Sequence, residues 1–163
     1  MLFRSNGPLW LKRGDVHASV SADVQRVESA AALARGLAGF ASRGIAAAAV
    51  QAHCEGDEIK FYGVAPGRFF HWYYTGTPAG RPVDPAALAR LAARAAAAAG
   101  LHVYGGDAIV APDGALTLID LNDWPSFAPC RDEAVAAIAN LLEARADAVR
   151  HHRPLAHPNQ SAV

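Results

Sequence analysis

The stretch that decides the fold is residues 105–127, GGDAIVAPDGALTLIDLNDWPSF. Its centre, Pro112-Asp113-Gly114, is typical of a tight turn, because proline fixes φ, aspartate bonds its own backbone and glycine supplies a positive φ. The flanking residues 107–111 and 115–121 are rich in the Val, Ile, Leu and Thr that are common in strands. The stretch therefore predicts two β-strands joined by a tight turn.

Acidic residues lie where this hairpin would bring them together. Folding about Asp113 places Asp107 opposite Ile119 or Asp120, and Asn122 leaves the same strand face as Asp120 because it lies two positions later. Two facing carboxylates repel each other, so a cation is expected between them. The all-oxygen set of Asp107, Asp120 and Asn122 suits Mg²⁺, with Mn²⁺ as the alternative metal. The competing interpretation is a surface hairpin whose aspartates are turn formers and solvated strand ends.

Length and composition bound the class of protein. The 163 residues carry 15 basic and 15 acidic side chains, which predicts one domain over residues 1–150 and no basic field for nucleic acid. The polar, proline-broken residues 151–163 are expected to form a disordered tail. There is no apolar run of about eighteen residues, so no membrane span is expected. Cys54 and Cys130 have no metal-ligand spacing, which favours free thiols in a reducing, cytoplasmic compartment. Nothing in the sequence indicates the oligomeric state.

The remaining chain predicts short strands interleaved with helices. Turn, cap and periodicity signals place strands at residues 9–12, 23–27, 57–64 and 68–74, and helices at residues 29–42, 85–99 and 131–149. Residues 46–53 are assigned to a strand by context alone, because their alanines suit a helix equally well. Together with the central hairpin, these elements predict an α+β fold in which an antiparallel sheet carries flanking helices. Trp124 and Phe127 are expected to cover the end of the hairpin. His71, Trp72, Tyr73 and Tyr74 are expected to pack on a sheet face rather than to stack on bases.

Three charged residues are candidates for a phosphate site. Glu58 and Lys60 share one strand face about 6.7 Å apart, which matches the ribose-to-phosphate reach of a nucleotide. Lys12 ends a strand beside a glycine-containing loop, as a phosphate clamp would. The alternative for all three is an ordinary exposed charge. Neither a GxxxxGK[ST] loop nor a GxGxxG fingerprint is present, so any ATP site is not of the P-loop or dinucleotide kind.

The order of these residues resembles the ATP-grasp superfamily, and in detail the ATP-binding half of carboxylate–amine ligases such as the D-alanine–D-alanine ligases. The most specific match is an acid, a second acid thirteen positions later and an asparagine two positions after that, continuing through NDWP at residues 122–125. The resemblance covers residues 9–145. It implies the antiparallel sheet and helices of the ATP-grasp C-terminal lobe, without the N-terminal domain and most of the first lobe. The early start of the chain agrees with a fragment or a truncated homologue.

The resemblance also implies a role for each candidate residue. ATP and Mg²⁺ are the implied cofactors, and the metal ligands are Asp107, Asp120 and Asn122. The implied nucleotide contacts are Lys12 on the inner phosphates, the backbone of Gln51, Ala52, His53 and Cys54 on adenine, Ile119 packed against adenine, and Glu58 on the ribose. Lys60 is the implied catalytic residue, approaching the terminal phosphate or the acyl phosphate.

The implied reaction is ATP-dependent ligation of a small-molecule carboxylate to an amine through an acyl phosphate. A small-molecule kinase that phosphorylates a hydroxyl group shares the architecture and stays open as a second enzyme class. A third possibility is a nucleotide-binding remnant without catalytic activity. The sequence identifies neither the acid nor the amine.

Overall fold

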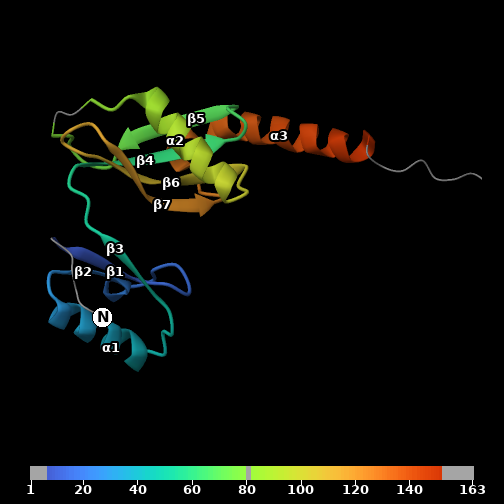
Figure 1. Cartoon of the computed structure of the whole chain (residues 1–163). Helices are drawn as coiled ribbons and strands as arrows, with labels where there is room; N and C mark the ends of the chain where they lie inside the picture. The colour runs from blue at the N-terminus through green and yellow to red at the C-terminus, as the bar shows by residue number, and fades with distance from the viewer. Residues whose placement is uncertain (1–6, 80–81, 152–163) are drawn as a thin grey trace, which may run out of the picture. The chain divides into compact units, whose positions relative to one another are not determined.

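The computed structural model describes residues 7–79 and 82–151, and the chain divides into two compact units, Met1–Cys54 and Glu55–Val163. Figure 1 shows the elements of both units. Each unit is described by itself. Within the described ranges, every helix is too short or too polar to cross a membrane.

The first unit is a three-stranded antiparallel sheet with one helix. Its strands are β1 (Leu9–Arg13), β2 (Val24–Val27) and β3 (Ala48–Ala52), in the order β2-β1-β3. Helix α1 (Ala30–Ser42) begins where the Ser29 side chain accepts a hydrogen bond from the Ala32 N–H, and it ends before Gly44, whose φ is 74°. The buried core of this unit consists of Leu11, Val27, Phe40 and Ile45.

A buried carboxylate holds the connection between β1 and β2. Asp23, at the end of the 3₁₀ turn η1 (Ser21–Asp23), is fully buried. It accepts hydrogen bonds from the backbone N–H groups of Ser19 at 2.9 Å and Val20 at 3.3 Å. The Arg43 guanidinium lies 2.8 Å away. These hydrogen bonds, opposed in part by burial, lower the pKa of Asp23 to about 2.

The second unit is built on a four-stranded antiparallel sheet. Its strands are β4 (Asp57–Val64), β5 (Phe69–Tyr74), β6 (Val103–Val110) and β7 (Leu116–Asp123), in the order β5-β4-β6-β7. The β4–β5 and β6–β7 pairs are the two hairpins predicted from the sequence. Gly114 has a φ of 89° in the β6–β7 turn, as the turn residues predict.

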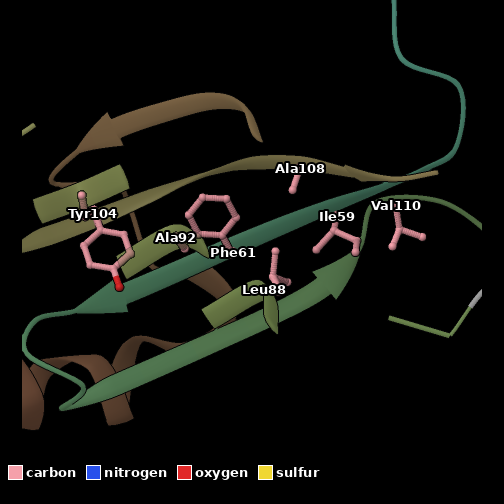
Figure 2. Packing of buried hydrophobic residues seen from close by; sticks show 8 residues of the cluster. Ile59, Phe61, Leu88, Ala92, Tyr104, Ala108 and Val110 are labelled. Atoms are coloured by element: carbon pink, nitrogen blue, oxygen red, sulfur yellow. The ribbon is translucent and has the colours of Figure 1, made fainter. Parts of the chain in front are cut away.

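One face of this sheet packs against helix α2 (Pro85–Ala98). The helix begins at Asp84, whose side chain accepts a hydrogen bond from the Ala86 N–H, with Pro85 as its first residue. The buried cluster beneath it includes Ile59 and Phe61 of β4, and Figure 2 shows it closely. The other members of this cluster are Leu88, Ala92, Ala96, Tyr104, Ala108 and Val110.

Helix α3 (Arg131–His151) packs on the opposite face, after the 3₁₀ turn η2 (Ala128–Cys130). Tyr62 and Val64 of β4 join this second cluster, and they alternate with the residues that face α2, as a strand requires. The cluster is completed by Val103, Phe127, Cys130, Ala134, Ala137 and Leu141. From Leu142 onward the helix residues are exposed, so α3 covers only one end of this face.

The α+β class predicted from the sequence is confirmed, with two antiparallel sheets rather than one. The predicted strands and helices all occur, with bounds that differ by a few residues. The strand predicted at residues 46–53 is shorter, and the last helix continues to His151. The tail predicted at residues 151–163 lies outside the described residues, apart from His151.

Gly106 gives a stability test of the β6–β7 pairing. A Cβ atom there would lie 2.2 Å from the Asp120 carbonyl oxygen and 2.8 Å from the Phe61 ring. We expect Gly106→Ala to lower the free energy of unfolding by about 1–3 kcal/mol, as overpacking does. Gly39→Ala, in α1 with nothing within 4 Å of the added carbon, should instead raise it by about 0.5–1 kcal/mol. Urea unfolding of both variants tests this; equal effects would contradict the packing.

Asp23 gives a test by pH. Because its pKa in the folded protein, about 2, lies below the ordinary 3.8, the carboxylate stabilises the fold above about pH 4, and this stabilisation is lost as the pH falls toward 2. We expect Asp23→Asn to be less stable than the parent at pH 7 and to lack this part of the acid dependence. Urea unfolding between pH 2 and 7 measures it, and parallel pH curves for the two proteins would contradict the assignment.

Candidate functional site

The register of the second sheet aligns the predicted site residues in one row. Lys60 on β4 pairs with Asp107 on β6, and Asp107 pairs with Asp120 on β7. Tyr73 on β5 pairs with Lys60 from the other side. Side chains that are direct cross-strand neighbours leave the same face of a sheet. The face that carries this row, opposite α2, is here called the open face.

A β-bulge in β7 brings the second acid to this face. Ala108 pairs with Leu118, but the next pair is Asp107 with Asp120, which leaves Ile119 as the additional residue. Leu118 and Leu121 consequently both pack on the cluster beneath α2, while Asp120 faces the same side as Asp107. The sequence left Ile119 and Asp120 as alternatives opposite Asp107, and the structure selects Asp120.

Two short contacts connect the polar groups of the open face. The Lys60 ammonium lies 2.5 Å from the Asp107 carboxylate, and these side chains are 33% and 18% exposed. The Asn122 amide donates a hydrogen bond of 2.5 Å to Asp120. Lys60 therefore neutralises the first acid, while the second has a neutral amide as its neighbour.

Packing closes one end of the open face and leaves the other accessible. Tyr62, one row beyond Lys60, is 6% exposed, because the Phe127 ring lies against it at 5.3 Å between centroids. Lys60, Asp107 and Asn122 are half-buried, and Asp120 is exposed. The candidate row therefore lies at the edge of the region covered by Phe127 and α3.

The segment after β7 turns back over this end. A Cβ atom on Gly105 would lie 2.8 Å from the Pro125 ring, so only glycine allows proline to pack there. Phe127, with a φ of 52°, is buried, which agrees with its predicted covering role. Trp124 is 64% exposed, so the prediction that it covers the hairpin end is wrong. Its φ of 44° lies in the left-handed region.

Two predicted nucleotide contacts lie beside the row. Glu58 is exposed on β4, two residues before Lys60 and therefore on the same face. It also borders a pocket of about 180 Å³ between the start of β4 and the loop after β5. Ile119 is the half-buried bulge residue directly before Asp120.

The other predicted contacts belong to the first unit. Lys12 lies on the central strand β1, where it pairs with Val24 and Ala49. Gln51 and Ala52 end the edge strand β3, and His53 and Cys54 follow. The Trp10 indole donates a hydrogen bond of 3.2 Å to the His53 ring, which fixes the start of this segment against β1.

The oxygen atoms of the open face fit a hard divalent cation. Asp107, Asp120 and Asn122 supply carboxylate and amide oxygens, the ligands that Mg²⁺ prefers. Rotation of the Asn122 amide exchanges its donor for its oxygen with no change of shape. In the ranges 7–79 and 82–151, no cluster of three or more His, Cys, Asp or Glu side chains is placed to hold a metal. The candidate set has two such side chains and would need ligands from elsewhere.

Sequence reasoning treated the β5 side chains as packing only. Trp72 and Tyr74 do pack on the α2 cluster, and Tyr73 packs on the α3 cluster, which confirms that expectation. Tyr73 and His71 nevertheless lie on the open face, with their rings 6.1 Å apart. The sequence could have shown this, because β5 side chains alternate between the two sheet faces. Once the register of the β4–β5 hairpin is known, each β5 residue can be assigned to the face of its β4 neighbour.

Comparison with known proteins adds no assignment: no protein-family model matches the chain, and no curated protein matches it. The residues of the open face are therefore interpreted from their own chemistry.

The tyrosines beside the site give a prediction by alkaline titration. Burial, then the hydrogen bond to Tyr73 and neighbouring negative charges including Asp107, raise the pKa of Tyr62. Burial raises the pKa of Tyr104. Because the neutral phenols are favoured in the fold, both stabilise it below about pH 10, and this is lost as the pH rises further. We expect tyrosinate absorbance of the native protein to lag behind that of the denatured chain, because Tyr62 and Tyr104 lose their protons at a higher pH in the fold. Superimposed titration curves would contradict this environment.

Proposed function

We propose that the second unit binds ATP together with Mg²⁺ on its open face, as part of an ATP-dependent carboxylate–amine ligase that acts through an acyl phosphate. The observation that carries the proposal is the row of Lys60, Asp107 and Asp120 across three neighbouring strands, with Asn122 beside it. An ammonium group next to two carboxylates and an amide is suited to a metal-bound triphosphate.

The charges of the open face support a metal-dependent site. Asp107 is already paired with Lys60, whereas Asp120 is exposed and accepts a hydrogen bond from the neutral Asn122 amide. Nearby Glu58 adds another exposed carboxylate. An anionic nucleotide would be repelled by this excess of negative charge. Asp107, Asp120 and Asn122 would hold Mg²⁺, which would supply positive charge to offset the phosphates of the nucleotide.

The side chains of this face would act by position and charge. The Lys60 ammonium, half-buried and fixed on a central strand, is suited to binding the terminal phosphate and to offsetting its charge during transfer. Glu58, about 6.7 Å away along the strand, would accept hydrogen bonds from ribose hydroxyls. The phosphate and adenine contacts proposed for Lys12, Gln51, Ala52, His53, Cys54 and Ile119 rest on the resemblance to ATP-grasp proteins. The proposed location is the cytoplasm.

Mg²⁺-dependent binding of ATP tests the site. We expect calorimetry to detect ATP binding only with Mg²⁺, and the Asp120→Ala, Asn122→Ala double variant to bind at least about a hundredfold more weakly, since loss of outer-shell groups alone costs about 10–100-fold. The matched control is Asn140→Ala, Asp147→Ala, which removes the same side-chain types from exposed positions of α3 and should bind like the parent. Equal loss in both variants, or binding without Mg²⁺, would contradict the site.

The ligase chemistry has its own test. With hydroxylamine present, a carboxylate substrate activated as an acyl phosphate is trapped as a hydroxamate. We would assay acetate, L-alanine, L-glutamate and succinate for hydroxamate that depends on Mg²⁺ and ATP. Nucleotide binding without hydroxamate, but with phosphate transfer to glycerol, would favour the kinase alternative.

A further inference from the structure

Successive rows of side chains divide the open face along β4. The register gives a row at Glu58, a row at Lys60 and a row at Tyr62. If the ribose lies at Glu58 and the terminal phosphate at Lys60, the nucleotide runs along β4 in the direction of Tyr62. The group that accepts the phosphoryl must then lie over the third row or beside it, because transfer requires the acceptor in line with the leaving oxygen.

The third row contains few groups that can bind an acceptor. Its members are His71 on β5, Tyr62 on β4, Gly105 on β6 and Asn122 on β7. Gly105 has no side chain, and Pro125 occupies the space above it. Tyr62 is buried beneath Phe127, and Asn122 belongs to the proposed metal set. His71 is half-buried and is the one member of this row that can carry a positive charge.

Tyr73 adds a second polar group next to His71. It neighbours Lys60 directly across β4 and β5, and its ring stacks on Tyr62 with centroids 6.4 Å apart and planes inclined by 25°. A hydrogen bond joins the two phenols. Stacking and this bond hold the Tyr73 ring on the open face against Tyr62. His71 and Tyr73 therefore place two polar groups beside each other on β5, next to Lys60, whose ammonium faces Asp107 on β6.

We propose that His71 and Tyr73 form the acceptor subsite and bind the substrate carboxylate that receives the phosphoryl group. This inference rests on the proposed function. An imidazole N–H and a phenol O–H are suitable donors to a carboxylate. Asp107 and Asp120 lie on β6 and β7, beyond β4, and Glu58 precedes Lys60 on β4, so the β5 positions opposite Lys60 and Tyr62 carry no carboxylate.

The reaction at this subsite balances without a base. A carboxylate oxygen attacks the γ-phosphorus, the bond from that phosphorus to the bridging oxygen of ADP breaks, and ADP carries away the electron pair. The products are an acyl phosphate and ADP, and no proton is transferred. An amine then displaces phosphate from the acyl carbon and loses its proton. His71 and Tyr73 are therefore assigned to binding and orientation, and a hydroxyl acceptor would instead require His71 to take a proton.

The test uses acetyl phosphate, the simplest acyl phosphate, with Mg·ADP in the reverse direction. In protein labelled at the Cε1 atoms of its seven histidines, the His71 signal is assigned by its absence in His71→Gln. We expect acetyl phosphate to shift that signal when Mg·ADP is bound, and Mg·ADP alone or inorganic phosphate to leave it in place. His71→Gln and Tyr73→Phe should raise the KM for acetyl phosphate in ATP formation about tenfold or more, with the Mg·ADP affinity unchanged. His102→Gln, whose ring contacts Arg145 instead, should change neither quantity.

The outcomes separate this inference from the proposed function. Bound Mg·ADP with an unmoved His71 signal would overturn the acceptor subsite and leave the nucleotide site standing. A His71 shift with glycerol 3-phosphate but not with acetyl phosphate would overturn the carboxylate assignment in favour of a hydroxyl acceptor. Failure of the parent protein to bind Mg·ADP by calorimetry would overturn the nucleotide site, and the acceptor subsite with it.

Discussion

In a strand with uninterrupted alternation, Leu118, Asp120 and Asn122 would all face the same side of the sheet. Leu118 must face α2 to bury its side chain, and the two polar residues would then be forced into the same apolar cluster. The bulge at Ile119 removes this conflict by shifting the alternation by one residue. Gly106 permits the close approach of the Asp120 carbonyl that accompanies it. The candidate site therefore depends on one irregularity of the backbone.

The unequal cover of the two sheet faces follows from the lengths and positions of the helices. Helix α2 packs along the whole cluster from Tyr104 to Val110. Helix α3 is reached through a short turn after Phe127, and only its first half packs on the opposite face. Sheet residues beyond that contact face solvent, where charged side chains are readily accommodated. Lys60 and Asp107 meet this requirement, and the same exposure makes them accessible to a ligand.

Much of this arrangement could be predicted from the sequence, because local signals determine it. Turn residues at 112–114 fix the hairpin, and the caps at Ser29 and Asp84 fix two helix starts. Regular period-two alternation does not predict the bulge. The spacing of the leucines does carry a trace of it: Leu116 and Leu118 are two positions apart, but Leu118 and Leu121 are three apart and still face the same side. The exposure of Trp124 depends on a positive φ and on contacts of its neighbours, which no local pattern encodes. The division into two units likewise depends on contacts distant in sequence.

The Lys60–Asp107 pair bears on how a metal and a nucleotide would enter the proposed site. Both side chains retain exposure, so their attraction is screened and the pair is inexpensive to separate, unlike a buried one. In the proposed complex, Mg²⁺ would replace the Lys60 ammonium beside Asp107, and Lys60 would turn to a phosphate of the nucleotide. Neither charged group would then lack a partner. Mg²⁺ and the nucleotide would then each raise the affinity of the protein for the other by the same factor, because the coupling free energy between two ligands is the same whichever binds first. A face with excess carboxylates would bind an anionic nucleotide only through such coupling, so the metal dependence of the proposed ATP binding would follow from the charge arrangement.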